Sequence, residues 1–211
     1  MTSYADLAQS VISGDEDLVI EQVKGLVAAG ESPLGIINEG LIAGMNVVGV
    51  RFKAGDMYVP EVLMSARSMA SGVEIVKPLI PVGDMKVKIK VLLGTVKGDL
   101  HDIGKNLVRI MMESSGLDVV DLGIDISPEA FVDAIKEHNP DILAMSALLT
   151  TTMANMKGTI EMLVEVGLRD KVKVIVGGAP VSQEFANSIG ADGFAADAAS
   201  ASDLCKELVA K

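Results

Sequence analysis

Tryptophan is absent from this chain, and aromatic residues of any kind make up only 3% of it. Since 49% of the residues are still hydrophobic, the chain can bury cores, but aliphatic side chains and 12 methionines have to build them. The single cysteine, Cys205, excludes an internal disulfide and a cysteine-based metal cluster. At 211 residues the chain can hold one large domain or two small ones.

Positive charge is also scarce, since 18 Lys and Arg residues stand against 29 Asp and Glu residues. Binding to nucleic acid or to an anionic membrane surface needs a basic face, so we expect neither as a partner. No uncharged apolar run approaches the length of about 18 residues that a membrane helix needs. The N-terminus also lacks the basic and then apolar segments of a secretory signal. We therefore expect a soluble cytoplasmic protein.

The first third of the sequence has the apolar spacing of helices and no strand alternation. The expected helices cover residues 3–12, 15–29, 33–50 and 60–76. Asp15 suits the N-cap of the second helix, and Ser32 followed by Pro33 suits the start of the third. Short turns join these helices, so residues 1–76 predict a small helical bundle.

From Lys88 onward, strand-like and helix-like segments alternate. The expected strands are 88–96, 118–123, 141–147, 172–177 and 193–196, and the expected helices are 103–115, 127–138, 152–167, 182–189 and 200–210. Five such units predict a flavodoxin-like parallel sheet, for which the strand order 2-1-3-4-5 is common. Ligands of such sheets bind beyond the carboxyl ends of the strands, where the order reverses between the first and third strands.

A proline- and glycine-containing segment separates the two parts. Pro78, Pro81 and Gly83 interrupt the helical pattern, so we expect a linker at 77–87. The chain then divides into a helical domain at 1–76 and an α/β domain at 88–211.

The loop after the first expected strand gives the strongest chemical signal. His101 lies there, with Asp99 two residues before it and Gly104 three residues after it. A carboxylate at this spacing can hold one imidazole nitrogen and leave the other free, and glycine lets a bulky group approach the backbone. On these residues alone, a hydrogen-bonded surface histidine is the commoner arrangement.

Two further loops belong to the same edge of the expected sheet. The loop after the third strand is rich in hydroxyl groups, from Ser146, Thr150, Thr151 and Thr152, and the fourth strand ends in Gly177-Gly178. Hydroxyls on one wall and bare backbone on the other predict a slot that suits a long polar tail carrying a planar group. A hydrolase pocket would need more titratable groups.

The run Lys97–Asn106 resembles the D-x-H-x-x-G signature of cobalamin (corrinoid) binding proteins, with Asp99, His101 and Gly104 at the signature positions. The resemblance implies cobalamin or a related corrinoid as the cofactor and His101 as the lower axial ligand of its cobalt. Asp99 would orient that ligand. Thr152, or else Ser146, would complete the relay, and relatives often have serine at the Thr152 position.

The resemblance extends to the other loops and to the helical part. It implies that further residues bind the cofactor, namely Asp102, Ile103, Gly104, Ser146, Leu148, Thr150, Gly177, Gly178 and Phe194. The stretch 40–63 resembles the cap of methionine synthase's cobalamin module. By that resemblance Phe52, Val59 and Val62 face the upper side of the corrin and shield its methyl group.

The chain is similar to the small corrinoid proteins of anaerobic methyltransferase systems, and this resemblance implies a methyl carrier. Such a carrier accepts a methyl group on Co(I) from a substrate-specific methyltransferase. It then delivers the group from methyl-Co(III) to a second methyltransferase that uses a pterin or thiol acceptor. A reductive activator is a further implied partner. We expect no self-sufficient enzyme, and the methyl donor stays open among methylamines, methanol, betaines and methoxylated aromatics.

Other functions share some of these features. One alternative is a cobalamin sensor or storage protein, although a sensor needs an effector domain, which is not visible. Another is the cobalamin subunit of a mutase, which usually lacks the helical cap. Residues 101–104 also spell the HDIG motif of metal-dependent phosphohydrolases, but those proteins are all-helical and need more histidines than His138 adds. A zinc enzyme lacks ligands for the same reason. A receiver domain shares the sheet but gives no reason for the His101 loop.

Overall fold

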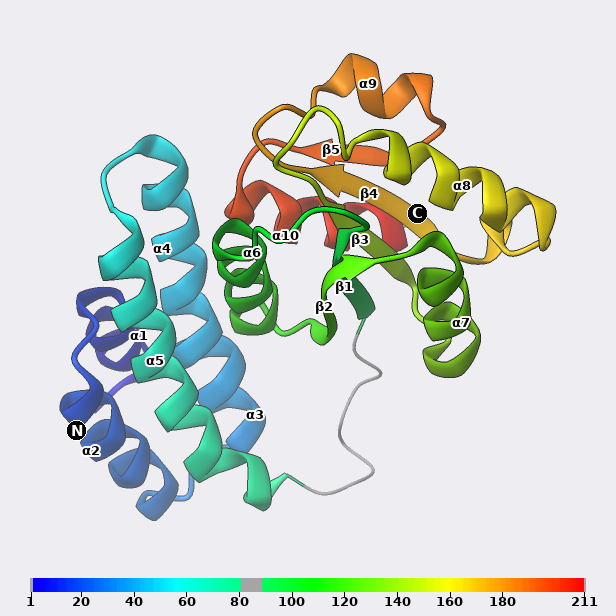
Figure 1. The fold of residues 1–211 in the computed structure, drawn as a ribbon. Helices are drawn as coiled ribbons and strands as arrows, with labels where there is room; N and C mark the ends of the chain where they lie inside the picture. Colours follow the sequence, from blue (N-terminus) through cyan, green and yellow to red (C-terminus); the bar gives the residue numbers. More distant parts are fainter. Residues whose placement is uncertain (1, 81–88, 211) are drawn as a thin grey trace. The chain divides into compact units, whose positions relative to one another are not determined.

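The computed structural model describes residues 2–80 and 89–210 (Figure 1). These residues form two compact units. Helices between Tyr4 and Leu79 form one unit, and the strands and helices between Lys90 and Val209 form nearly all of the other. Of the expected linker at 77–87, only residues 77–80 are described, and they begin with the short 3-10 helix η2 (Lys77–Leu79). Pro81 and Gly83 lie outside the described residues.

The first unit is a helical bundle. Its helices are α1 (Tyr4–Ser13), α2 (Glu16–Ala28), α3 (Pro33–Gly35), η1 (Ile36–Ile42), α4 (Ala43–Ala54) and α5 (Val59–Val76). The side chain of Asp15 accepts a hydrogen bond from the Leu18 amide at 3.0 Å, and that of Ser32 accepts one from the Gly35 amide at 3.4 Å. These caps fix where α2 and α3 begin, as the sequence predicts.

The third expected helix is longer than predicted and irregular. It runs as α3, η1 and α4 without interruption, and η1 is a π-helix. A Cβ at Gly40 would lie 2.6 Å from Leu7, and one at Gly44 would lie 2.7 Å from the Ala8 carbonyl oxygen. These glycines let α1 pack directly against the helix backbone. The helix ends only at Gly55, which has the left-handed φ of 78° that terminates many helices.

One stretch of the described chain, Pro33–Ala54, could cross a membrane by its length and composition alone. This is weak evidence, because a buried core helix passes the same test, and 44% of the most apolar 18-residue window of this stretch is buried.

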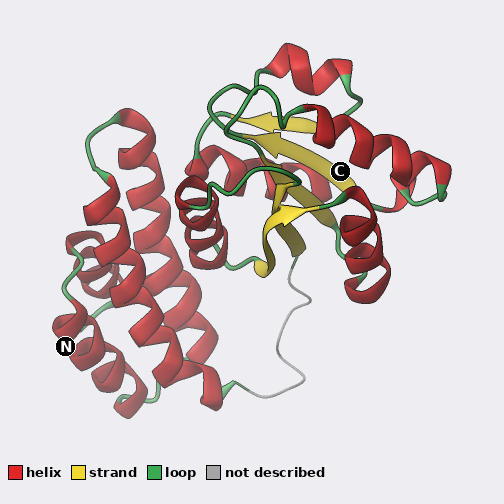
Figure 2. Cartoon of the chain, viewed as in Figure 1, coloured by secondary structure: helices red, strands yellow, loops and turns green. Residues whose placement is uncertain are grey.

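The second unit contains one parallel sheet of five strands, whose place in the unit is seen in Figures 1 and 2. The strands are β1 (Lys90–Val96), β2 (Asp118–Ile126), β3 (Ile142–Ser146), β4 (Lys173–Gly177) and β5 (Gly193–Ala195). Their order is β2-β1-β3-β4-β5, and every pairing is parallel. The predicted fold class, a helical bundle followed by a flavodoxin-like sheet of this order, is confirmed.

Helices pack on both faces of this sheet. They are α6 (Ile103–Ser114), α7 (Pro128–His138), α8 (Ala154–Glu165), η3 (Arg169–Lys171), α9 (Gln183–Ser188) and α10 (Ala198–Val209). One core joins Leu92 and Leu143 of the sheet to α7, α8 and α9, and the other joins Val91 and Ile142 to α6 and α10. Successive strand residues face opposite cores, which explains the nearly continuous apolar runs of β1 and β3. Cys205 is a buried core residue of α10.

The edge strand β2 extends to Ile126, three residues beyond the expected end. Its pairing with β1 is irregular, since Leu93 pairs with Asp121, Gly94 with Gly123 and Val96 with Ile126. Each step leaves an extra residue on β2, as in a β-bulge. Because bulges interrupt the two-residue alternation, the sequence pattern places the end of this strand too early.

Candidate functional site

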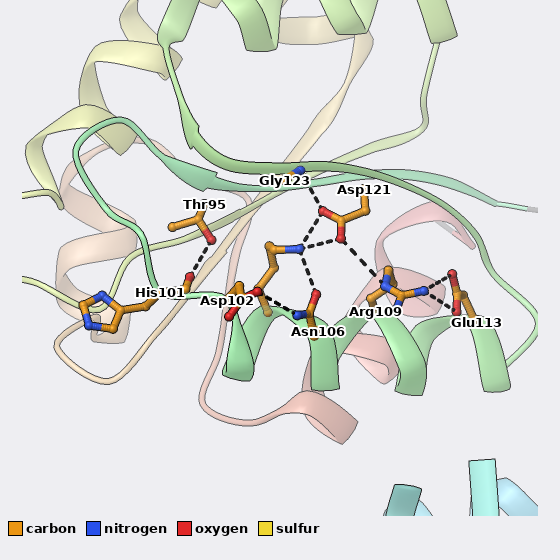
Figure 3. Close-up of polar contacts among 9 residues, drawn as sticks. Thr95, His101, Asp102, Asn106, Arg109, Glu113, Asp121 and Gly123 are labelled. Carbon is orange, nitrogen blue, oxygen red and sulfur yellow. Dashed lines mark hydrogen bonds and ion pairs between the residues drawn. The ribbon is translucent and has the colours of Figure 1, made fainter. Parts of the chain in front are cut away.

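His101 lies on the loop between β1 and α6, at the carboxyl edge of the sheet. Its imidazole Nδ1 is 2.7 Å from Oδ1 of Asp99, and its backbone N–H donates to the same oxygen at 3.1 Å. Its backbone carbonyl accepts a hydrogen bond from the Thr95 hydroxyl at 3.0 Å (Figure 3). The imidazole is therefore oriented from within the chain, while 51% of the side chain remains exposed.

Asp99 is fully buried and joins the loops that follow β1 and β3. Its Oδ2 accepts hydrogen bonds from the Leu148 amide at 2.7 Å, the Leu149 amide at 3.2 Å and the Thr152 hydroxyl at 2.8 Å. Burial raises the pKa of this carboxyl. The hydrogen bonds from Leu148, His101 and Thr152 lower the pKa by more than burial raises it, so the pKa lies well below its usual range. Asp99 is therefore a carboxylate in the folded protein.

The ionised state of Asp99 sets the tautomer of the His101 imidazole. A carboxylate can only accept, so Nδ1 of His101 carries the hydrogen and Nε2 keeps a free lone pair. In the parts of the chain that the structure describes, no group of three or more His, Cys, Asp or Glu side chains could hold a metal ion. His101 alone therefore suits one position on a metal whose other ligands come from outside the chain, as in a metal held by a macrocycle.

The two loops that meet at Asp99 also expose large apolar side chains. Ile103 is 84% exposed, and Leu100, Leu148 and Leu149 are exposed as well. Grouped exposed apolar side chains typically mark a binding surface. A single nitrogen ligand among apolar side chains fits a flat ligand with a metal at its centre.

The three glycines of the site differ in whether the fold itself leaves room for a side chain. A Cβ at Gly104 would meet no protein atom within 4 Å, so packing within the chain does not require glycine there and an external group has room to approach. A Cβ at Gly178 would overlap the backbone carbonyl of Ala147, and its φ of 127° also demands glycine. A Cβ at Gly177 would lie 3.0 Å from the Ala195 carbonyl oxygen. The fold itself therefore explains Gly177-Gly178, and their role in a tail slot stays a prediction.

Of the residues expected in the site, the structure joins Asp99, His101, Leu148 and Thr152 by hydrogen bonds. Thr152 supplies the hydroxyl of the relay, and among the described residues Asp99 accepts no hydrogen bond from Ser146. Asp102 instead contacts Asn106, whose side-chain amide donates to its carboxylate at 3.2 Å (Figure 3).

Among the described residues of the sheet unit, no hydrogen bond joins the remaining expected residues to His101. Ser146 ends β3 beside Gly177, Thr150 is exposed, and Phe194 packs partly buried against the core. In the helical unit, Phe52 is half-buried and Val59 is exposed. Val62 is fully buried, which does not favour its expected role in shielding a ligand.

Sequence patterns miss several residues that organise this loop. The Leu148 and Leu149 contacts come from backbone amides, which no side-chain pattern reveals. Lys105 is only 3% exposed while Ile103 is largely exposed, the reverse of what their polarity predicts. One feature of the sequence points to this support: Asp125 follows Gly123 by two residues, just after the expected end of the second strand.

Comparisons with known proteins agree with this geometry over both units. Residues 89–203 match a family described as a B12 binding domain, and residues 4–77 match a second family of the same description. The dimethylamine corrinoid protein of Methanosarcina barkeri is 47% identical over 207 residues, which cover 97% of this chain and 96% of that protein.

Two solved structures are similar over nearly the whole chain. A cobalamin-binding protein from Desulfitobacterium hafniense DCB-2 is 34% identical with a TM-score of 0.84, covering 99% of each chain. The methanol:cobalamin methyltransferase complex MtaBC from Methanosarcina barkeri contains a chain that is 33% identical with a TM-score of 0.84, covering 97% of this chain and 78% of that one.

The donor set of the site fits the cofactor of these proteins. One exposed imidazole with a fixed tautomer suits an axial position, the apolar side chains suit a corrin face, and Gly104 leaves room for it. This chain belongs to the B12-binding corrinoid proteins.

Proposed function

We propose that this protein is a methyl carrier that works between separate methyltransferases. The observation that carries the proposal is the half-exposed imidazole of His101, held through Nδ1 by the buried carboxylate of Asp99. When a corrinoid is bound, its cobalt supplies the methyl-transfer chemistry. The protein supplies the Nε2 ligand from His101, holds its tautomer through Asp99 and orients Asp99 through Thr152.

The described residues offer little besides this ligand for activating a substrate. The site has one histidine, one buried carboxylate and backbone amides, and no group of titratable side chains that could hold a second metal. Activation of the methyl donor therefore falls to a partner enzyme. The similarity to a chain in a methyltransferase complex supports a substrate-specific methyltransferase as that partner.

The relatives also favour one class of methyl donor. Several of the most similar curated proteins are named dimethylamine corrinoid proteins, with 43–47% identity. We propose a methylamine as the methyl source. A second methyltransferase with a pterin or thiol acceptor and a reductive activator complete the proposed system. The expected shielding of a bound methyl group by Phe52 and Val59 stays part of this proposal.

The ligand assignment can be tested by electron paramagnetic resonance of the cob(II)alamin-loaded protein with ¹⁵N-labelled histidine. Ligation by histidine gives a ¹⁵N doublet on the cobalt signal, whereas ligation by the unlabelled base of the cofactor gives a ¹⁴N triplet. We expect the doublet in the wild-type protein and its loss in His101→Ala. The matched control is His138→Ala, which removes the other histidine and should keep the doublet. A doublet that survives His101→Ala would exclude His101 as the ligand.

The carrier role needs its own experiment. The reduced holoprotein is mixed with a methylamine-specific methyltransferase and ¹³C-methyl-labelled dimethylamine, and the label that coelutes with the holoprotein is measured. We expect about one label per bound cofactor, and none without the methyltransferase. Labelling from methanol but not from dimethylamine, with the matching methyltransferases, would show the donor class to be wrong and the carrier role to be right.

A further inference from the structure

The bulged end of β2 has an unusual backbone. Gly123 and Asp125 have φ angles of 90° and 57°, and the register with β1 slips twice in this segment. Left-handed backbone is unfavourable for a residue with a Cβ, and such residues persist where their surroundings hold them. β2 is an edge strand, and its pairing with β1 does not itself require this distortion. The contacts of Asp125 give the distortion a role in the loop that carries His101.

Asp125 forms two hydrogen bonds with the start of the loop that carries His101. Its Oδ1 accepts a hydrogen bond from the Gly98 amide at 2.7 Å, and its own backbone N–H donates to the Asp99 carbonyl at 3.2 Å. Asp125 thus binds the Gly98 amide through its side chain and the Asp99 carbonyl through its backbone. Asp99 in turn sets the imidazole of His101.

The same segment of β2 also forms an ion pair with the residue that follows the loop. The buried ammonium group of Lys105, in the first turn of α6, donates to both carboxylate oxygens of Asp121, with 2.6 Å to Oδ1. Oδ1 of Asp121 also accepts a hydrogen bond from the Gly123 amide at 2.9 Å, which fixes the bulge (Figure 3). The loop is held from β2 on both sides of His101, by side chains that hydrogen-bond to its neighbours Gly98 and Lys105 and not to the imidazole.

We propose that the bulged segment Asp121–Asp125 positions the cobalt ligand, with Asp125 as the positioning residue. The inference rests on the proposed ligation by His101 and goes beyond it, because it assigns a function to residues that lie outside the relay. If Asp125 releases the Gly98–Asp99 segment, Asp99 and the imidazole become free to shift. The equilibrium between ligated and unligated His101 then moves toward the unligated state.

Two substitutions at Asp125 separate positioning from general stability. Asp125→Gly removes the acceptor of the Gly98 amide and also relieves the left-handed backbone. The two effects oppose each other, so we expect the urea midpoint of the cofactor-free protein to change little. Asp125→Asn keeps an oxygen acceptor, and asparagine tolerates the left-handed region, so it serves as the conservative rescue.

The readout is the ratio of the ¹⁵N doublet to all signal without it, whether a ¹⁴N triplet or a signal without nitrogen splitting. It is measured from pH 5 to pH 9 in cob(II)alamin-loaded protein with labelled histidine. For Asp125→Gly we expect this ratio to fall about tenfold or more at each pH, as the loss of one hydrogen bond to a charged group implies. For Asp125→Asn, which keeps a neutral acceptor oxygen, we expect the ratio to fall by no more than about fivefold.

Two results would overturn the inference. One is a ratio for Asp125→Gly within twofold of the wild type across the pH range. The other is an equal loss in Asp125→Gly and Asp125→Asn, which would show that the acceptor oxygen is not what matters. Failure of the proposed function looks different, because the wild-type doublet would then be absent or would survive His101→Ala.

Discussion

At the scale of single residues, the site depends on one buried carboxylate. Asp99 accepts five hydrogen bonds, two from His101 and three from the loop after β3. The histidine could be found from the sequence because the spacing of Asp99, His101 and Gly104 is distinctive. Three of the five donors are backbone amides, which the sequence cannot indicate.

Asp99→Asn is expected to destabilise the cofactor-free protein at neutral pH by about 2–3 kcal/mol, because a charged and buried acceptor is lost. The pKa of Asp99 is lowered on folding. Its contribution is therefore complete well above the ordinary aspartate pKa of about 3.9 and is lost as pH falls through the folded pKa. Urea unfolding should show the same difference between wild type and variant at pH 7.0 and 5.5, and a difference smaller by about 0.5–1 kcal/mol at pH 3.5. A difference that grows in acid would contradict the ionised state of Asp99.

Gly104→Ala tests whether glycine is there for the ligand. No protein atom opposes a Cβ at this helical position, so alanine should stabilise the cofactor-free protein by about 0.5–1 kcal/mol. The same Cβ would meet the bound corrinoid, and we expect the affinity for aquacobalamin in a calorimetric titration to fall about tenfold or more.

The matched control is Gly158→Ala in α8, where a Cβ is equally unopposed. It should give a similar gain in stability with unchanged affinity. Equal affinities for the two variants would mean that nothing approaches Gly104.

At the scale of elements, the regular parts of the fold could be predicted and the irregular parts could not. β1, β3 and β4 lie between two cores, so their apolar runs are nearly continuous and their positions follow from the sequence within two residues. The sequence predicts the helix at 33–50 and the strand at 118–123. It does not indicate that η1 is a π-helix, which departs from the 3.6-residue period, nor that β2 continues to Ile126, because bulges break the alternation. In both places the chain follows contacts with another element rather than its own pattern.

The ion pair of Lys105 and Asp121 links α6 to β2 and can be tested by stability. Asp121→Asn leaves a buried ammonium group without its partner and should lower the free energy of unfolding by about 3–5 kcal/mol. The double variant Lys105→Met with Asp121→Leu removes both charges and should cost much less.

Chemical unfolding of the two variants is compared with that of Asp133→Asn, which removes an exposed ion pair with Lys136 and should have little effect. If the double variant is as unstable as Asp121→Asn, the burial of an unpaired charge is not the cause.

At the scale of the whole molecule, the sheet unit contains everything that its own cores require. Both hydrophobic clusters consist only of residues that follow the proposed linker, from Ile89 to Leu208. The Asp99 network likewise draws only on the loops after β1 and β3. Fold and ligand geometry can thus be explained without the helical unit.

We therefore expect a fragment of residues 89–211 to fold and to retain corrinoid. Its circular dichroism should show a cooperative thermal transition, and gel filtration should show cobalamin coeluting with it. The His101→Ala fragment is the control, in which the ¹⁵N-histidine doublet should be lost. A fragment that folds but releases the cofactor would place the main binding interactions in the helical unit.

The two edge strands of the sheet, β2 and β5, resist pairing with another strand in different ways. β5 has only three residues, which is too short to receive a neighbouring chain along its length. β2 is long, but its bulges interrupt the row of amides and carbonyls, and Asp118, Asp121 and Asp125 place negative charge along it. The bulges that hold the His101 loop thereby also protect this edge of the sheet from pairing with the sheet of another copy of the protein.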